Sequence, residues 1–600
     1  MHEGPRGVRR AWWIAIVVGC GTEPVVDHDA DSVPPPPSAP LWGVPISGGT
    51  MLATRDGNRA VIADPDRDRI VIVDLTTEAV AQTIALPSGS EPGRLVEDGQ
   101  GRIHIALRRS GELLTLTDPQ VRRPICGEPR GLAWDASTDL IHVACATGEL
   151  VSVPAAGGDP VRVLRLDRDL RDVIVRDRSL LVSTFRTAEL LEVSDSGRVS
   201  ARVTLPTTQR IDATGEPFAP TDAGAPPKVD AIAEVAWRTI ALPDGRVLVA
   251  HQRKINSALE SRSGGYSAGC NSGPVESALT VVDARNRPFA VTPLIAGALP
   301  VDVAIHPGGE IIAVATAGDH GVTQIGAFHL TEPDDKDCGA GTGFSCNGCI
   351  LSEGVDDSQL GAPTSVAYRP NGNLLVFYPE RPALVIHGVT KRVVDLGGEA
   401  GYDRARNLFH AQTTLQLACA SCHPEAREDG QVWSFAEFGP RRTLPLGGGI
   451  LHRAPYHWSG DMANLGTLLD QVLTTRMAGP FVDATTASAL GDWLDRIPAA
   501  KGVILDTAAV ERGRTLFTSQ ELGCTTCHAT LDRLVDVGTG GVFKVPSLLG
   551  VGARAPYLHN GCAATLEDRF GACGGGDLHG HTSLLSPAQR ADLISYLQAL

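Results

Sequence analysis

A loose repeat between residues 41 and 396 constrains the fold of this chain more than any other feature of its sequence. Short apolar runs, such as Ile103-His104-Ile105-Ala106-Leu107, alternate with Gly, Asp and Pro turns, and helical periodicity is absent. The repeat opens in a similar way near Thr50, Gly93, Gly131, Asp172, Val235, Asp302 and Ser365. Units of four strands that recur at roughly 40 residues are typical of a β-propeller. We therefore expect an N-terminal all-β propeller of about seven blades over residues 41–396.

Three stretches of this region are too long and too polar to be turns within a blade, namely residues 207–230, 252–277 and 331–361. We expect them to be surface insertions, because long loops of this kind often carry binding residues. A protein partner that docks on the propeller is therefore part of the prediction.

The first forty residues predict export instead of a folded domain. Three arginines among the first ten residues precede an apolar run at 11–18, which is too short to span a membrane and leads into Val17-Val18-Gly19-Cys20. This ending resembles a bacterial lipoprotein signal, in which the cysteine, here Cys20, is acylated. We predict a signal peptide at 1–20, a Pro-rich tether at 21–40 and a periplasmic or cell-envelope protein with a lipid anchor at Cys20. A plain secretory signal is the alternative.

The overall charge excludes one class of partner. The chain has 53 basic and 69 acidic residues and a formal net charge of −16. An acidic surface repels the phosphate backbone, so we expect no nucleic-acid partner. No segment beyond the N-terminus is apolar over the roughly 18 residues that a membrane helix needs.

Four of the 13 cysteines lie in two similar pentapeptides, Cys419-Ala420-Ser421-Cys422-His423 and Cys524-Thr525-Thr526-Cys527-His528. Two thiols at this spacing can add to the two vinyl groups of one haem, and the adjacent histidine can bind its iron. We therefore predict two covalently bound haem c groups, with His423 and His528 as iron ligands.

Eight cysteines remain when Cys20 is also set aside, and an even number suits disulfides in an oxidising compartment. Cys126 with Cys145, and Cys562 with Cys573, are the predicted local pairs. The pairing stays open for Cys270, Cys338, Cys346 and Cys349. A zinc site on the last two of these cysteines is the less favoured alternative to a disulfide.

Residues 397–600 contain two halves with similar sequence features, which indicates a duplication. Each half contains one haem motif, an Arg-Ala-Pro-Tyr string at 453–456 or 554–557, and an amphipathic closing helix. We expect Asp483 to cap the first of these helices and Ser586 to cap the second. Two mainly α cytochrome c modules in tandem are predicted, at residues 397–502 and 503–600.

Both modules resemble the bacterial dihaem cytochrome c peroxidases and their relatives that oxidise protein tryptophans. The resemblance rests on the paired haem motifs, on residues 545–548, 554–561 and 564–567, and on Tyr456-His457-Trp458-Ser459-Gly460-Asp461. It implies that the first haem activates peroxide and that the second relays electrons. It also implies that Trp458 lies between the two haems as a catalytic residue. The propeller region resembles the WD40-like and lactonase-like propellers of exported bacterial proteins.

Two departures from the peroxidase pattern bear on the reaction. Where that family carries Glu-Met-Gly, with the Glu as an acid/base group, this chain has Arg476-Met477-Ala478-Gly479. A guanidinium is always protonated and cannot accept a proton. Second modules of the family often use a late methionine as the sixth iron ligand, yet no methionine follows His528 here.

The sixth iron ligands are therefore predicted separately for each module. Met477 lies 54 residues after the histidine of the first motif, a spacing that suits a thioether ligand, and packing in the pocket is an equal alternative. His452 and His457 are further candidates for this haem. For the second haem we favour His579, ahead of the closing helix, with an exposed histidine as the alternative and His559 as a pocket residue.

Two functional classes follow from these features. One is an exported, peroxidase-like dihaem oxidoreductase, in which one haem reacts with peroxide or a similar oxidant and the other relays electrons. The other is a non-catalytic electron-transfer protein whose propeller docks a partner. Both imply a small electron-donor or electron-acceptor protein. The missing carboxylate favours the second class, whereas the peroxidase-like strings favour the first, toward which the prediction leans.

Overall fold

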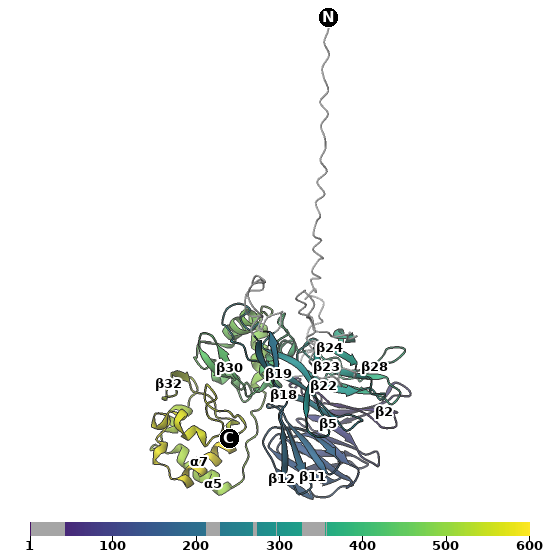
Figure 1. Ribbon diagram of the computed structural model, residues 1–600, viewed down its shortest axis with the longest axis horizontal. Helices are drawn as coiled ribbons and strands as arrows, with labels where there is room; N and C mark the ends of the chain where they lie inside the picture. The colour runs from purple at the N-terminus through teal and green to yellow at the C-terminus, as the bar shows by residue number, and fades with distance from the viewer. Residues whose placement is uncertain are drawn as a thin grey trace. The chain divides into compact units, whose positions relative to one another are not determined.

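Seven antiparallel sheets of four or five strands follow one another along the chain and form a β-propeller (Figure 1). The computed structural model describes Met1 and residues 43–211, 228–267, 273–295, 297–326, 354–355, 357–401 and 403–600. The predicted tether, the anchor at Cys20 and all of the predicted signal peptide except Met1 lie outside these residues. So do the four cysteines of open pairing, Cys270, Cys338, Cys346 and Cys349.

In every blade, strands that are neighbours in the chain are also neighbours in the sheet. The first two blades contain β1 (Met51–Ala53), β2 (Arg59–Asp64), β3 (Arg69–Asp74) and β4 (Ala79–Ala85), then β5 (Pro92–Glu97), β6 (Ile103–Leu107), β7 (Glu112–Leu116) and β8 (Val121–Pro124). The third and fourth contain β9 (Pro129–Asp135), β10 (Leu140–Cys145), β11 (Glu149–Pro154) and β12 (Arg162–Arg165), then β13 (Leu170–Arg176), β14 (Ser179–Thr184), β15 (Leu190–Ser194) and β16 (Val199–Val203). The fifth has five strands, β17 (Thr208–Ile211), β18 (Lys228–Ala241), β19 (Val247–Ile255), β20 (Val275–Val282) and β21 (Pro288–Ile295). The last two contain β22 (Pro300–Ile305), β23 (Ile311–Thr316), β24 (Gly321–Gly326) and β25 (Gly354–Val355), then β26 (Ser365–Tyr368), β27 (Leu374–Tyr378), β28 (Ala383–His387) and β29 (Arg392–Asp395).

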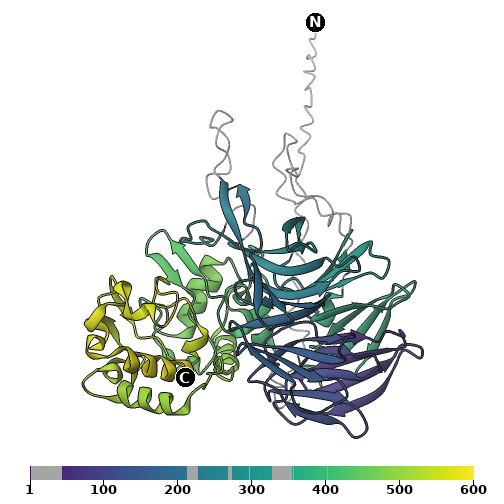
Figure 2. The same cartoon turned by 60° about the horizontal axis from the view of Figure 1, so that its bottom comes forward.

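The blades stack face to face because their inner strands are apolar on both faces. Strand β6 is buried along its whole length, whereas the outer strand β4 is almost entirely exposed. The first and last blades lie side by side and close the ring (Figure 2). Met51 and Ile62 of the first blade share a buried cluster with Phe377 and Leu384 of the last. Six of the seven predicted openings lie in or next to the first strand of a blade, and Val235 lies in β18, the second strand of the fifth blade. These seven strands contact one another around the centre. The prediction of about seven blades is confirmed.

The region after the propeller is mixed and modestly helical. Its helices are α1 (Arg404–His410), α2 (Cys419–Cys422), α3 (Leu465–Leu468), α4 (Ala484–Asp495), α5 (Thr507–Thr518), α6 (Cys524–His528) and α7 (Pro587–Ala599). Two hairpins are formed by β30 (Val432–Phe435) with β31 (Gly439–Arg442) and by β32 (Leu534–Asp536) with β33 (Val542–Lys544). The prediction of mainly α modules is therefore only partly right, because much of this chain runs in loops and short turns around two cavities instead of packing as helices.

The two predicted closing helices are present with their predicted caps. The Asp483 carboxylate accepts a hydrogen bond from the Thr486 backbone N–H at the start of α4, and Ser586 and Gln589 form a reciprocal capping box at the start of α7. Helices α5 and α7 approach closely at Gly513, where a β-carbon would lie 2.0 Å from the carbonyl oxygen of Asp592. Only glycine permits this approach. No described helix is both long and apolar enough to cross a membrane.

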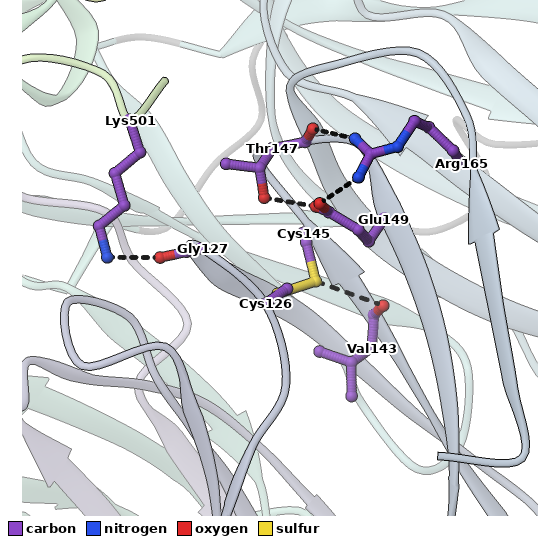
Figure 3. The surroundings of a disulfide bond; sticks show 8 residues. All are labelled: Cys126, Gly127, Val143, Cys145, Thr147, Glu149, Arg165 and Lys501. Carbon is purple, nitrogen blue, oxygen red and sulfur yellow. Dashed lines mark hydrogen bonds and ion pairs between the residues drawn. A yellow bond between two sulfur atoms is a disulfide. The ribbon is translucent and has the colours of Figure 1, made fainter. Parts of the chain in front are cut away.

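Both predicted local disulfides, Cys126–Cys145 and Cys562–Cys573, are present. The first lies where the segment between α4 and α5 meets the propeller (Figure 3). There Lys501 donates hydrogen bonds from Nζ to the carbonyl oxygens of Gly127 and Arg109, at 2.5 and 2.9 Å. The disulfide thus supports the loop that holds this connecting segment.

One expected surface insertion is residues 252–277, and its described residues, 252–267 and 273–277, instead form an interface with the C-terminal region. Leu259 is only 3% exposed. Its N–H donates to the Ser434 carbonyl oxygen at 2.8 Å, and its own carbonyl accepts from the Ala436 N–H at 2.9 Å. The prediction of a surface loop is wrong here, because apolar side chains in the stretch are buried against β30. Most of the other two stretches lies outside the described residues, at 212–227 and 327–353.

Candidate functional site

A cavity of about 260 Å³ lies beside the first cysteine pentapeptide. Cys419, Cys422 and the following His423 line it, and neither thiol forms a disulfide. Most of the remaining wall is apolar and includes Leu465, Leu469, Leu490 and Leu494. The local fold therefore presents two free thiols and one imidazole to a largely apolar cavity.

The imidazole of His423 is fixed by the loop that follows it. Its Nδ1 donates a hydrogen bond to the Arg427 carbonyl oxygen at 3.1 Å, which leaves Nε2 unprotonated. Burial lowers the pKa of His423 to about 4, so the ring is neutral at pH 7. A neutral imidazole with one nitrogen held by a carbonyl is the usual state of a metal-binding histidine.

Met477 lines the same cavity and is 4% exposed. It directly follows a π-helical segment, Leu469–Arg476, and such segments are frequent at functional sites. The structure therefore places Met477 and His423 on the wall of one cavity. Of the two other candidate ligands, His457 also lines this cavity and pairs with Asp461 at 3.4 Å, whereas His452 does not line it.

A second cavity, of about 480 Å³, lies beside the other pentapeptide. Cys524, Cys527 and His528 of α6 line it, and both thiols are again free. Phe517 of α5 and Leu593 of α7 contribute to its apolar wall. The duplication read from the sequence thus corresponds to two cavities with the same chemical groups on their walls.

His528 and His579 face each other across the second cavity. Their ring centroids are 6.3 Å apart and the ring planes differ by 29°. Nδ1 of His579 donates to the Gly574 carbonyl oxygen at 3.1 Å, which leaves its Nε2 unprotonated. Burial lowers the pKa of His528 to about 4 and that of His579 to about 3. A metal–imidazole bond is about 2 Å long, so two neutral rings whose centroids are 6.3 Å apart are close enough to bind the same metal ion.

Trp458 lines both cavities, and it is the only aromatic residue that does so in the described part of the chain. Its side chain is buried, and its indole N–H donates to the Arg442 carbonyl oxygen at 2.7 Å. The indole meets Phe543 and His559 edge to face, at centroid distances of 6.4 and 6.2 Å. These contacts fix Trp458 between the two predicted sites, and His559 lies in the second cavity as expected.

Positive charge dominates where the two cavities adjoin. Arg442, Lys544 and Arg554 line both of them, and Asp461 and Asp577 are the only described carboxylates on either wall. Burial lowers the pKa of Lys544 to about 8 and that of Arg554 to about 10. A ligand with anionic groups at its edge would match this charge distribution.

The loop after His423 is docked into the propeller through Glu425. This carboxylate is 3% exposed and forms ion pairs with Arg108, Arg130 and Arg171, at 3.3, 2.6 and 2.7 Å. Burial acts to raise its pKa, but the charges of these three arginines outweigh burial and hold the pKa well below the ordinary value. Glu425 also has a positive φ of 53°. The propeller therefore holds the backbone two residues beyond the imidazole of the first site.

A second buried carboxyl, Glu234 of β18, lies beside this loop. It is fully buried, and its neighbours are Asp429 of the loop and Lys254 of β19. Burial and the negative charge of Asp429 raise the pKa of Glu234 well above its ordinary value, against the opposing charge of Lys254. The pKa of Asp429 is raised to about 6, mainly by burial.

These shifts predict a stability that falls as the pH rises. A carboxyl whose pKa is higher in the folded than in the unfolded chain contributes most below the unfolded pKa, and its contribution is lost as the pH increases. Glutamine does not titrate, so we expect Glu234→Gln to remove the part of this pH dependence that Glu234 causes. The stability of the variant relative to the wild type should therefore grow between pH 5 and 8, by up to about 1.4 kcal/mol per pH unit.

Urea denaturation of both proteins across this pH range checks the expectation. Glu399→Gln, which changes an exposed side chain, is the matched control and should follow the wild type. Parallel pH profiles for the wild type and Glu234→Gln would show that Glu234 does not carry the proton.

Glu425, Glu234 and Tyr266 are site residues that sequence reasoning missed. Glu425 and its partner Arg171 are 254 positions apart, so no local pattern connects them. Glu234 gives one signal, since it is the only charged residue in the run Ala231-Ile232-Ala233-Glu234-Val235-Ala236-Trp237. Tyr266 lies in the stretch that was expected to be a surface loop, yet it lines the first cavity.

Sequence comparison finds no matching family model and no matching curated protein. Among solved structures, hydrazine synthase of Kuenenia stuttgartiensis is 15% identical, with a TM-score of 0.43 over 57% of this chain and 95% of that chain. A streptogramin B lyase is 9% identical, with a TM-score of 0.37 over 56% and 92%. Virginiamycin B lyase of Staphylococcus aureus, as an inactive variant with quinupristin, is 9% identical, with a TM-score of 0.38 over 56% and 94%. The assignment of a propeller rests on the seven sheets of the present structure.

Proposed function

We propose that this chain is an exported dihaem c-type oxidoreductase, similar to the bacterial cytochrome c peroxidases. The observation that carries the proposal is the pair of adjoining cavities, each with two free thiols and a neutral histidine on its wall. The other described cysteines are all in disulfides, so these four are the ones kept available.

The residues present fit a haem c in each cavity. Cys419 and Cys422 would attach the first group, with His423 and Met477 toward its iron. Cys524 and Cys527 would attach the second, and His528 and His579 would be available to bind its iron. The excess of cationic side chains where the cavities adjoin suits the carboxylates at a haem edge. When bound, such groups supply reversible one-electron chemistry at iron.

The protein's own residues prepare the two sites for this chemistry. The carbonyl oxygens of Arg427 and Gly574 hold His423 and His579 in the tautomers that can bind a metal. The apolar walls limit the access of water to each site, and this access influences the redox potential of a bound metal. Trp458 places an aromatic side chain between the two sites, where electrons would pass.

A specific observation also supports an electron carrier as the second candidate. His528 and His579 are close enough to bind one metal ion together, and Met477 lines the first cavity together with His423, so that each site has a second candidate ligand. In either case we propose a small electron-donor or electron-acceptor protein as the partner. A periplasmic or cell-envelope location, with a lipid anchor at Cys20, is part of the proposal.

Haem attachment is the first test. Protein produced in a host with haem-attachment machinery should keep two haems per chain through acid-acetone extraction. Cys524→Ala/Cys527→Ala should keep one, and so should Cys419→Ala/Cys422→Ala. Cys562→Ala/Cys573→Ala removes a disulfide instead and should keep both. Haem that extracts from the wild type would contradict the proposal.

The reaction with peroxide then separates the two candidates. In stopped-flow mixing of half-reduced protein with peroxide, a peroxidase-like enzyme should show a fast spectral change at the first site. An unchanged spectrum would favour the electron carrier.

A further inference from the structure

The propeller supplies part of the wall of the first cavity. The stretch between β19 and β20 contributes Leu259, Tyr266 and Pro274 to this wall. Its backbone is tied to the segment that ends in Met477, because the N–H of Gly264 donates to the Thr475 carbonyl at 2.8 Å and that of Tyr266 donates to the Arg476 carbonyl at 3.1 Å. Tyr266 is thus fixed beside the residues that replace the Glu-Met-Gly string of the peroxidase pattern.

The Tyr266 side chain packs on Phe435 of β30, edge to face, with a centroid distance of 6.0 Å. Burial raises the pKa of the Tyr266 phenol, and the charge of Arg476 and its hydrogen bond to the phenol oxygen only partly offset this. The phenol is therefore a neutral hydroxyl at pH 7, which can donate one hydrogen bond and accept others. Arg476 is 5% exposed, and its Nε has no hydrogen-bond partner among the described residues.

Several other donors near this cavity are already used by protein acceptors. The indole N–H of Trp433 donates to Asp429 and Thr443, and that of Trp458 donates to the Arg442 carbonyl. The Arg453 guanidinium donates to three backbone carbonyls, those of Pro445, Gly447 and Gly448. Tyr266 and Arg476 are a hydroxyl and a cation that lie next to each other on the wall of the cavity.

We propose that Tyr266 and Arg476 form the ligand-recognition side of the first cavity. They would bind a small ligand with a negatively charged or electron-rich atom, through a hydrogen bond from the phenol and the positive charge of the guanidinium. The propeller would then complete the reactive site of the C-terminal region, in the place where the related peroxidases use a carboxylate. This inference rests on the proposed function, because the ligand would sit on the haem of the first cavity.

The test measures ligand affinity, not turnover. Fluoride is titrated into the oxidised protein and its binding is followed in the haem absorbance. Tyr266→Phe keeps the ring on Phe435 and the backbone hydrogen bond, so it should fold and keep both haems. We expect its fluoride affinity to fall about tenfold, which corresponds to about 1.4 kcal/mol. Arg476→Gln should weaken fluoride binding as well.

Tyr456→Phe is the matched control, because the Tyr456 hydroxyl donates to the Ile450 carbonyl at 3.3 Å and is not free for a ligand. Its fluoride affinity should equal that of the wild type. Equal affinity in Tyr266→Phe, or no fluoride binding by wild-type protein with both haems attached, would overturn the inference while leaving haem attachment intact. Absence of covalent haem would instead overturn the proposed function, and this inference with it.

Discussion

Glu425→Leu is expected to destabilise the protein by about 3–5 kcal/mol, because removal of the shared carboxylate from a buried ion-pair cluster leaves an excess of buried positive charge. The Glu425 carboxylate is the shared partner of Arg108, Arg130 and Arg171. The side chains of all three arginines are less than 10% exposed, so water cannot replace the lost partner. Electrostatic repulsion between the three arginine side chains would lower the stability of the variant further.

Denaturation of the purified wild type and variant by urea measures this effect. Glu511→Leu is the control, since Glu511 pairs with Arg514 on the surface, where both side chains are 57% exposed. Exposed pairs of this kind contribute roughly 0–1 kcal/mol. If Glu425→Leu were no more destabilising than Glu511→Leu, the interface between the propeller and the first site would not depend on this cluster.

Trp458→Phe is expected to slow electron exchange between the two sites at least about tenfold, equivalent to about 1.4 kcal/mol in the activation barrier. The indole is the only described aromatic side chain that lines both cavities, and its N–H is hydrogen-bonded to the Arg442 carbonyl. Phenylalanine keeps most of the packing but loses this hydrogen bond. It also loses the indole, which is oxidised more readily than a phenyl ring.

Rapid mixing of the oxidised protein with less than one equivalent of reductant would follow the redistribution of electrons between the two haem spectra. Trp433→Phe is the control, because Trp433 lines the first cavity but not the second. We expect it to leave the exchange rate unchanged. Equal rates in Trp458→Phe and wild type would mean that electrons pass by another route.

The sequence by itself determined the features that depend on nearby residues. Alternating apolar runs and turns identified one strand near the centre in each of the seven blades, because strand formation and turn chemistry are local. Asp483 and Ser586 were identifiable as caps for the same reason. Cys126 and Cys145 are 19 positions apart and Cys562 and Cys573 are 11 apart, which is close enough for local pairing to be inferred.

Only the tertiary structure decided which distant residues share a site. Tyr266 reaches the first cavity because the stretch between β19 and β20 pairs with β30, and nothing local to that stretch predicts this pairing. His579 was one of several candidate histidines, and the loop ahead of α7 is what places it opposite His528. Glu425 was not identified at all, because its three arginines come from separate parts of the propeller. These contacts join residues that are hundreds of positions apart. Their burial and charge pairing depend on how the parts of the chain pack, which a local sequence pattern does not predict.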